Sequence, residues 1–201
     1  MNKRIALKTV AASVLLTLGL GLLGACTESK PQFHGVDITG ADYAKDFRLA
    51  DHNGQVRSLQ DFKGKAVIVF FGYTQCPDVC PTSMAELAEV KKLLGADGDK
   101  LQGIFVTVDP ERDTREVMAE YISAFDPRFT GLTGTREQVD GIIAAYRVYA
   151  RKVDREKGPY LMDHTATVYL LDKDGKFTGT LDYHEATDTA LAKLKRLIGT
   201  S

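Results

Sequence analysis

The chain has 201 residues, of which 44% are hydrophobic and 26% are charged, a composition typical of globular proteins and not of disordered or fibrous ones. Its formal net charge is −1, so no basic patch is expected and nothing indicates nucleic-acid binding. The length and composition favour one folded domain.

The first 25 residues have the pattern of an export signal. Three basic residues precede an apolar run from about Thr9 to Leu23, which is shorter than the roughly 18 to 20 apolar residues of a membrane-spanning helix. The segment LGAC, which ends at Cys26, resembles the box at which bacterial signal peptidase cuts lipoproteins. We therefore expect a lipid on Cys26 and an exported, membrane-anchored lipoprotein that faces the periplasm or the cell exterior; an uncleaved membrane anchor is the alternative.

Cleavage would divide the chain into three parts. Residues 1–25 would be the signal peptide, residues 26–36 a lipidated polar tether, and residues 37–201 the folded domain. The mature chain would carry 23 basic and 27 acidic residues, because the signal peptide holds three basic residues and no acidic one. Cys76 and Cys80 then remain as a local pair in an oxidising compartment, where a disulfide can form but must be reduced before the sulfurs bind a metal.

Two strand patterns open the folded domain. Residues 47–50 and 55–59 flank the turn DHNG, and Asn-Gly between alternating segments predicts a hairpin with His52 in a solvated turn. Residues 66–71 (AVIVFF) are too short and too β-branched for a helix, and they are apolar on both faces. They predict a central buried strand, and the loop with the two cysteines leaves its C-terminal end.

The rest of the domain alternates between helical and strand patterns. The helix after the cysteines should run from near Pro81 to Gly95, with Ser83-x-x-Glu86 as a candidate cap. The further expected elements are a strand at 104–108, a loop at 109–113, a helix at about 114–125 with Val117, Met118, Tyr121 and Ile122 inward, a helix at 135–146, a charged excursion at 147–163, a hairpin of residues 165–171 and 177–181, and a helix at 186–198.

This order predicts an α/β fold. It is typical of a thioredoxin-like sandwich with a mixed central sheet flanked by helices, an N-terminal hairpin and a late charged loop insertion. In such a sheet, sites form beyond the carboxyl ends of the strands, where the cysteine loop must lie.

The segment FFGYTQCPDVCP carries the main chemical signal. Because Pro77 and Pro81 lack an amide proton, the helix should begin near Cys80. The helix N-terminus should then favour a thiolate at Cys80, the form that attacks disulfides and binds metals. A spacing of four residues leaves the sulfurs of Cys76 and Cys80 close enough to share an ion or to form a disulfide.

A metal site needs a third donor, and four histidines are candidates. His34 falls in the tether, His52 in a turn and His184 at the end of a strand. His164 follows the long polar excursion and stands just before an apolar strand, where a thioredoxin-like sheet brings it toward the cysteine loop. We therefore assign His164 as the third ligand, with Asp163 as a hydrogen-bond acceptor that orders its ring. Position alone also fits a surface histidine.

Three segments together resemble the Sco/SenC family of thioredoxin-like copper proteins. They are FFGYTQCPDVCP, VTVDPERDT and DHTATVYLLDKDG, and the likeness extends over roughly residues 35–200. The resemblance implies that Cys76, Cys80 and His164 bind copper. It also includes the loop at residues 109–112, which the residues themselves give no physical reason to treat as a site instead of a turn.

The resemblance further implies a membrane-tethered copper chaperone. Such a protein helps to assemble the dinuclear copper centre of cytochrome c oxidase, or reduces the cysteines of that centre. The implied partners are the copper-centre subunit of the oxidase and other periplasmic copper chaperones or thiol reductants.

The donor set agrees with copper on chemical grounds. Thiolates are soft ligands that suit Cu(I), and with a weak further donor the same three residues can hold Cu(II), whereas zinc would require a fourth ligand. A low ligand count also favours release, because thiolates of a partner can enter the coordination sphere. Met162, beside His164, is a candidate extra donor, Met84 and Met118 are expected in the core, and Tyr73 and Tyr160 are expected to flank the site or to pack near it.

Three readings without metal remain open. A thiol-disulfide oxidoreductase would use Cys76 and Cys80 alone, although three residues separate them where thioredoxins have two. A peroxiredoxin is suggested by VCPT, but Pro77 stands where that family has threonine. A structural lipoprotein would hold an inert disulfide between the two cysteines.

Overall fold

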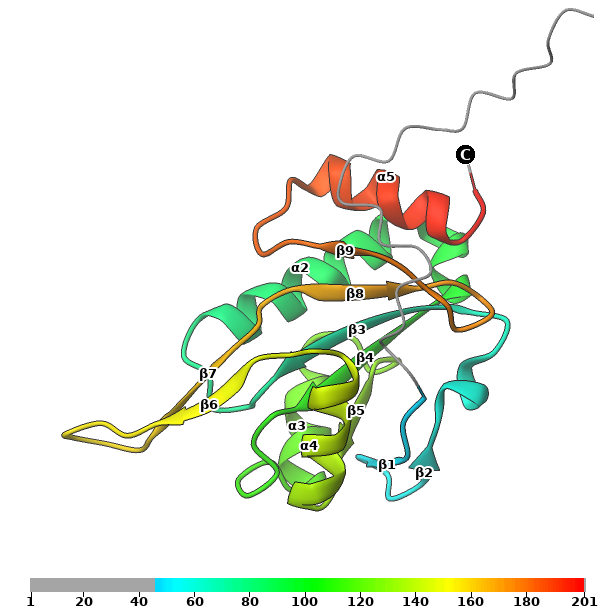
Figure 1. The fold of residues 1–201 in the computed structure, drawn as a ribbon. Coiled ribbons are helices and arrows are strands. Elements are labelled where there is room, and N and C mark those ends of the chain that lie inside the picture. Colours follow the sequence, from blue (N-terminus) through cyan, green and yellow to red (C-terminus); the bar gives the residue numbers. More distant parts are fainter. Residues whose placement is uncertain (1–45, 201) are drawn as a thin grey trace, which may run out of the picture. The chain divides into compact units, whose positions relative to one another are not determined.

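The computed structural model of the protein describes residues 46–200. The expected signal peptide, the tether with Cys26 and His34, and the start of the folded domain at residue 37 lie outside these residues. Within them, seven strands form one sheet in the order β2-β1-β5-β4-β3-β8-β9, and β6 and β7 form a separate two-stranded sheet (Figure 1).

The elements have the following bounds. The large sheet contains β1 (Leu49–Asp51), β2 (Val56–Arg57), β3 (Ala66–Gly72), β4 (Leu101–Thr107), β5 (Thr130–Thr133), β8 (Val168–Leu171) and β9 (Phe177–Leu181). The small sheet pairs β6 (Ala150–Val153) with β7 (Leu161–His164). The helices are α2 (Val79–Leu93), α3 (Arg115–Ser123), α4 (Arg136–Ala145) and α5 (Thr187–Leu197), with short 3-10 helices η1 (Leu59–Phe62) and η2 (Gly95–Lys100).

Strand β3 is a fully buried strand in the interior of the sheet, as the run AVIVFF predicts. It pairs in parallel with β4 and antiparallel with β8, and all seven of its residues are buried. Both faces of this strand must therefore be covered by other elements. The α/β, thioredoxin-like sandwich with a mixed central sheet is confirmed.

Helices cover both faces of the sheet. On one face, Phe70 of β3 contacts Phe105 of β4, whose ring lies 5.2 Å from that of Tyr121 on α3. On the other face, Tyr146 at the end of α4 contacts Phe71, with ring centroids 5.2 Å apart. Helix α5 packs against α2 and lies beside β9 (Figure 1). The large aromatic side chains of adjacent β3 residues thus fill two opposite layers of the core.

Two strand regions differ from the sequence prediction. Strand β5 was not expected, because TGLT is short and three of its four residues are glycine or threonine; the strand forms by pairing with β4 and β1. The charged excursion at 147–163 contains the β6–β7 hairpin. Its strands lack apolar alternation because the hairpin extends away from the large sheet, as Figure 1 shows.

Several local predictions were wrong. Ser83 does not cap α2, because the helix begins at Val79 and Ser83 is buried within it. Val117 is 37% exposed, whereas Met118 and Ile122 of the same helix are buried as expected. His52 is not simply solvated: its ring Nδ1 accepts a hydrogen bond of 3.1 Å from the Gly131 amide, which ties the β1–β2 turn to β5.

None of the helices within residues 46–200 combines the length and the apolar character that crossing a bilayer requires.

Two glycines provide a test of the packing. A methyl group at Gly103 of β4 would overlap the buried Phe129 ring, so Gly103→Ala should lower the free energy of unfolding by about 1–3 kcal/mol. Gly141 lies on the exposed side of α4 with open space at its Cβ position, so Gly141→Ala should raise it by about 0.5–1 kcal/mol. Urea unfolding of both variants checks the pair; equal effects would contradict this packing.

Candidate metal centre

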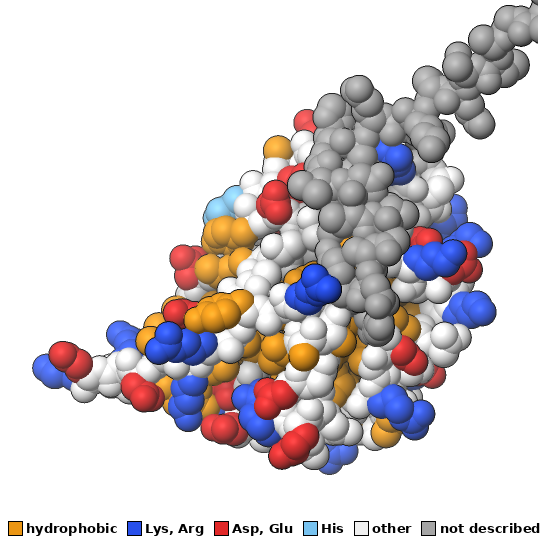
Figure 2. Space-filling model, in the orientation of Figure 1, with side chains coloured by type: hydrophobic (Ala, Val, Ile, Leu, Met, Phe, Trp, Pro, Cys, Tyr) orange, Lys and Arg blue, Asp and Glu red, His pale blue; other side chains and the backbone are white. Residues whose placement is uncertain are grey.

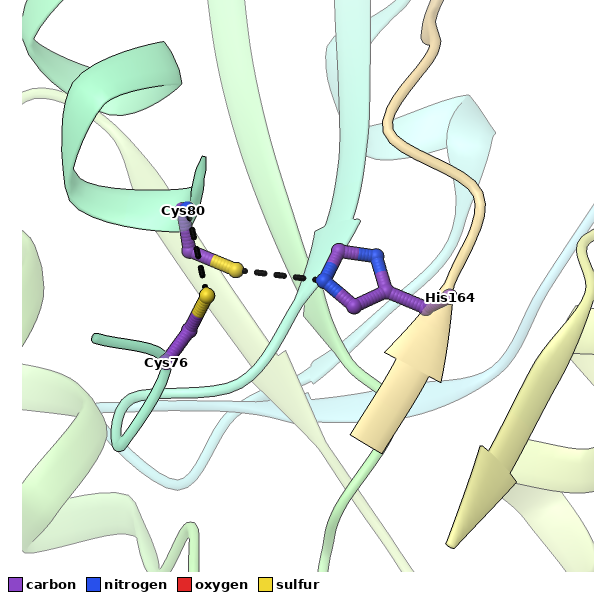
Figure 3. Close-up of side chains that lie close together, drawn as sticks. All are labelled: Cys76, Cys80 and His164. Carbon is purple, nitrogen blue, oxygen red and sulfur yellow. Dashed lines mark hydrogen bonds between the residues drawn. The ribbon is translucent and has the colours of Figure 1, made fainter. Parts of the chain in front are cut away.

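The cysteine loop connects the end of β3 to the start of α2. Cys76 lies in the loop and is half-buried, whereas Cys80 lies in the first turn of α2 and is fully buried; neither is in a disulfide. The backbone amide of Cys80 donates to the Cys76 sulfur over 3.3 Å (Figure 3). The sulfur of Cys76 therefore occupies the amide-rich end of the helix.

His164 meets the cysteines from the other side. It is the last residue of β7, and its Nε2 lies 3.3 Å from the sulfur of Cys80, although 84 positions separate the two residues (Figure 3). The three donor atoms of Cys76, Cys80 and His164 all lie within 4.8 Å of one another. The fold thus brings together the three residues that the sequence analysis selected.

A backbone carbonyl sets the orientation of the His164 ring. The ring Nδ1 lies 3.0 Å from the Thr165 carbonyl oxygen, which favours the tautomer with the proton on Nδ1 and a lone pair on Nε2 toward the sulfurs. Asp163, which we assigned to this position, is exposed, and no hydrogen bond joins it to the ring in the described part of the chain. The backbone carbonyl takes that position because alternating side chains of a strand point to opposite sides.

Aromatic rings enclose the imidazole. The rings of Phe70 and Tyr73 contact it edge-on, with centroid distances of 6.2 and 5.9 Å. Tyr73 is buried. These contacts restrict rotation of the ring and exclude water from one side of the site.

The two thiols differ in their acidity, and in the opposite sense to our prediction. Hydrogen bonds from the Cys80 thiol and from the backbone amides of Asp78 and Cys80, together with the nearby His164 ring, outweigh the burial cost and lower the pKa of Cys76 to about 3. The hydrogen bond to the Cys76 sulfur, burial and the Cys76 charge raise the pKa of Cys80. The thiolate therefore belongs to Cys76, whose sulfur accepts from the Cys80 thiol and also from the Cys80 amide.

Asp113 holds the cysteine loop through hydrogen bonds, and the sequence did not predict this role. Its buried carboxylate accepts hydrogen bonds from the Thr74 hydroxyl (2.6 Å), the Thr74 amide (3.1 Å) and the Thr107 hydroxyl (2.6 Å). The loop is thereby bonded to the end of β4. The only signal in the sequence was that Asp113 follows the conspicuous segment DPER, and nothing in the sequence connected it to Thr74.

Close packing also restricts Cys80. A Cβ atom at Gly72 would lie 2.9 Å from the Cys80 sulfur and 2.8 Å from the Phe105 ring, so only glycine leaves room there. The buried sulfur is thus held by the end of β3 as well as by its own helix.

The other candidate residues lie elsewhere. Met84 and Met118 are in the core as expected, and Met162 is also buried in it. His184 contacts Glu86 over 2.9 Å. Tyr160 packs on the loop at residues 109–113.

The donor set fits a soft metal ion. Two sulfurs and one imidazole nitrogen suit Cu(I), which accepts three ligands, and they fall one short of the four ligands of a structural zinc site. Among the residues that the structure describes, this is the group of three or more Cys, His, Asp or Glu side chains with metal-binding spacing.

Sequence comparisons identify relatives of the whole described region. A family model described as SCO1/SenC matches residues 36–199. The protein SCO2 homolog of Bos taurus mitochondria is 43% identical over 148 residues, which are 72% of this chain and 54% of that protein. The SCO2-like protein of Rickettsia felis is 35% identical over 172 residues, with 82% and 84% coverage. The chain thus spans about half the length of its bovine relative.

Solved structures agree with these matches. Bradyrhizobium japonicum ScoI with copper bound is 47% identical to this chain, with a TM-score of 0.70 over 76% of this chain and 97% of that structure. Yeast Sco1 with copper bound is 33% identical, with a TM-score of 0.70 over 78% and 88% of the two chains.

The unequal thiols predict an unusual pH profile for alkylation of the reduced protein. Because the pKa of Cys76 is about 3, its reaction with iodoacetamide should be nearly as fast at pH 5 as at pH 7, and Cys80 should react only after unfolding. Mass spectrometry of the alkylated peptides measures both. Faster labelling of Cys80, or a tenfold loss in the Cys76 rate per pH unit below 7, would contradict the assignment.

The lowered pKa of Cys76 also makes the stability of the folded protein depend on pH. The folded-state pKa of Cys76 lies below its ordinary value of 9.0, so the thiolate stabilises the fold fully above about pH 9 and progressively less as the pH falls toward 3. A Cys76→Ser variant should lose this pH dependence.

Proposed function

This chain belongs to the SCO1/SenC family, and on that premise we propose that it is a copper chaperone that binds copper through Cys76, Cys80 and His164. The observation that carries the proposal is the convergence of two sulfurs and one imidazole nitrogen within 4.8 Å. The copper-bound ScoI structure, at 47% identity, supports copper as the metal.

The chain's own residues suggest how copper enters. The half-buried thiolate of Cys76 is the accessible donor, so it is the first ligand in our scheme. Binding by the second sulfur requires the Cys80 thiol to lose its proton, because the thiolate is the ligand form. The Nε2 lone pair of His164 already faces that sulfur.

Release would use the same exposed side. A three-donor site leaves room for a thiolate of a partner, and Cys76 is the ligand that the partner can displace first. We propose the copper-centre subunit of cytochrome c oxidase as the acceptor, with periplasmic copper chaperones or thiol reductants as further partners. The family resemblance supports this choice of partners.

We also propose the location that the N-terminal sequence predicts. Residues 1–25 would be a signal peptide, Cys26 would carry a lipid, and residues 26–36 would tether the domain of residues 37–201 to a membrane that faces the periplasm or the cell exterior. The tether would hold the copper site near membrane-bound acceptors.

A thiol-disulfide oxidoreductase is the second candidate. The observation in its favour is the pairing of a half-exposed thiolate at Cys76 with a protonated thiol at Cys80, which suits attack on a partner's disulfide followed by resolution. Such an enzyme would not require the imidazole that lies 3.3 Å from Cys80.

Ligand variants test the proposal. Competition with a chromophoric Cu(I) chelator should show that Cys76→Ser and Cys80→Ser lose tight binding. His164→Ala should weaken it by about 100-fold or more, since loss of even an outer-shell partner costs 10–100-fold. His184→Asn is the matched control and should bind as the parent does, because His184 pairs with Glu86 and has a φ of 56° that asparagine tolerates. Unchanged affinity in all ligand variants would refute the copper site.

The same His164→Ala variant separates the two candidate functions. If the protein acts as a chaperone, copper transfer to an acceptor peptide with two cysteines should be lost. If it acts as an oxidoreductase, reduction of a disulfide in that peptide should continue at the parent rate.

A further inference from the structure

The loop between β4 and α3 contacts both halves of the metal centre. From it, the Arg112 side chain extends between the cysteine loop and the β6–β7 hairpin. Its Nη1 donates to the Tyr160 carbonyl over 2.9 Å and to the Gln75 side chain over 3.1 Å, and its Nε bonds to the buried Asp109 carboxylate. One side chain therefore joins three segments that are distant in sequence.

Tyr160, the residue before β7, makes further contacts with this loop and with β6. The Arg112 guanidinium lies 3.7 Å from the centre of its ring, and the Lys152 ammonium of β6 lies 3.8 Å from it. The Tyr160 hydroxyl donates to Asp109 over 2.9 Å. Cation-π contacts and hydrogen bonds thus attach the hairpin to the loop.

The hairpin needs such an attachment. It pairs only within itself, apart from the seven-stranded sheet, and an isolated two-stranded hairpin is marginally stable in water. Figure 2 shows that the protruding arm carries basic and acidic side chains, as expected for a surface surrounded by solvent. Because β7 ends at His164, movement of this hairpin would move the imidazole.

Arg112 also lies near Tyr73, one of the two aromatic residues that contact the imidazole. Its guanidinium lies 5.5 Å from the centre of the Tyr73 ring, which contacts the imidazole of His164 edge-on. The cysteines have a separate anchor, since Asp113 holds Thr74. Adjacent residues of one loop therefore contact the two halves of the centre: Asp113 holds the cysteine loop through Thr74, and Arg112 attaches the hairpin that carries the imidazole to the same loop region.

We propose that Arg112 is a positioning residue for His164, which holds the β6–β7 hairpin so that the imidazole nitrogen stays within bonding reach of the Cys80 sulfur. This inference rests on the proposed copper function only for its effect on affinity. The effect on the position of the imidazole is independent of any metal.

A double-mutant cycle tests the proposal. Arg112→Gln should weaken Cu(I) binding by about 10–100-fold in the parent background. In the His164→Ala background the same substitution should cost much less affinity, because only the exposed bond of Arg112 to Gln75 still connects it to the cysteine loop. Equal losses in both backgrounds, or no loss in the parent, would overturn the proposal.

A second measurement does not use copper. In histidine NMR spectra of the reduced, metal-free protein, the His164 ring signals should shift or broaden in Arg112→Gln, whereas those of His184 should stay in place. If the parent bound no copper, the proposed function would fail, and these spectra would still decide the role of Arg112. Unchanged His164 signals would refute that role.

The chain offers a matched control. Arg57 on the edge strand β2 makes the same kind of contacts as Arg112, since its Nε donates to the buried Asp51 and its Nη2 to Gln55. Arg57→Gln should leave both the copper affinity and the His164 signals unchanged. Arg112→Lys should restore part of the affinity, because it keeps the charge but loses the planar fork.

A second variant tests the proposal in case Arg112→Gln does not fold. Tyr160→Leu removes the stacked ring and its hydroxyl bond to Asp109 but keeps the bond between Arg112 and Asp109. It should produce the same selective shift of the His164 signals. A Tyr160→Leu variant with parent affinity and parent spectra would count against the proposal.

Discussion

The contact between one imidazole nitrogen and one buried sulfur determines what this protein can do. His164 Nε2 lies 3.3 Å from the Cys80 sulfur, and this contact turns a local cysteine pair into a site with three donors. Two sulfurs alone are equally compatible with a disulfide, a redox pair or half of a metal site. The imidazole favours metal, and soft donors in low number favour copper that can be passed on.

The two residues of this contact are held differently: the core fixes Cys80, whereas a hairpin outside the large sheet carries His164. Cys80 is packed against the end of β3, where a Cβ atom at Gly72 would come too close to the Cys80 sulfur and to the Phe105 ring. His164 is carried by a hairpin outside the large sheet, and this hairpin is attached through contacts at Tyr160. The Cys80 sulfur is therefore fixed in the core, whereas the imidazole can move with the hairpin that carries it.

Some local expectations failed because they treated each residue within its own segment. The helix N-terminus was expected to ionise Cys80, but the Cys80 amide points at the Cys76 sulfur four positions earlier. Asp163 was expected to order the imidazole, but strand geometry turns its side chain away and the Thr165 carbonyl serves instead. In both cases the orientation of neighbouring groups decided the chemistry. That orientation cannot be read from residue type and spacing.

The sequence by itself determined the central strand, the cysteine loop after it and the alternation of strands and helices, because apolar periodicity and turn residues are local signals. Its position left His164 open as a surface histidine, and the family resemblance selected it as the third donor. Only the tertiary structure decided that TGLT becomes a strand, that the charged excursion is a hairpin, and that Asp113 and Arg112 support the two halves of the centre. These features arise from contacts between segments that are distant in the chain, and a short polar segment carries no sign of its future partner.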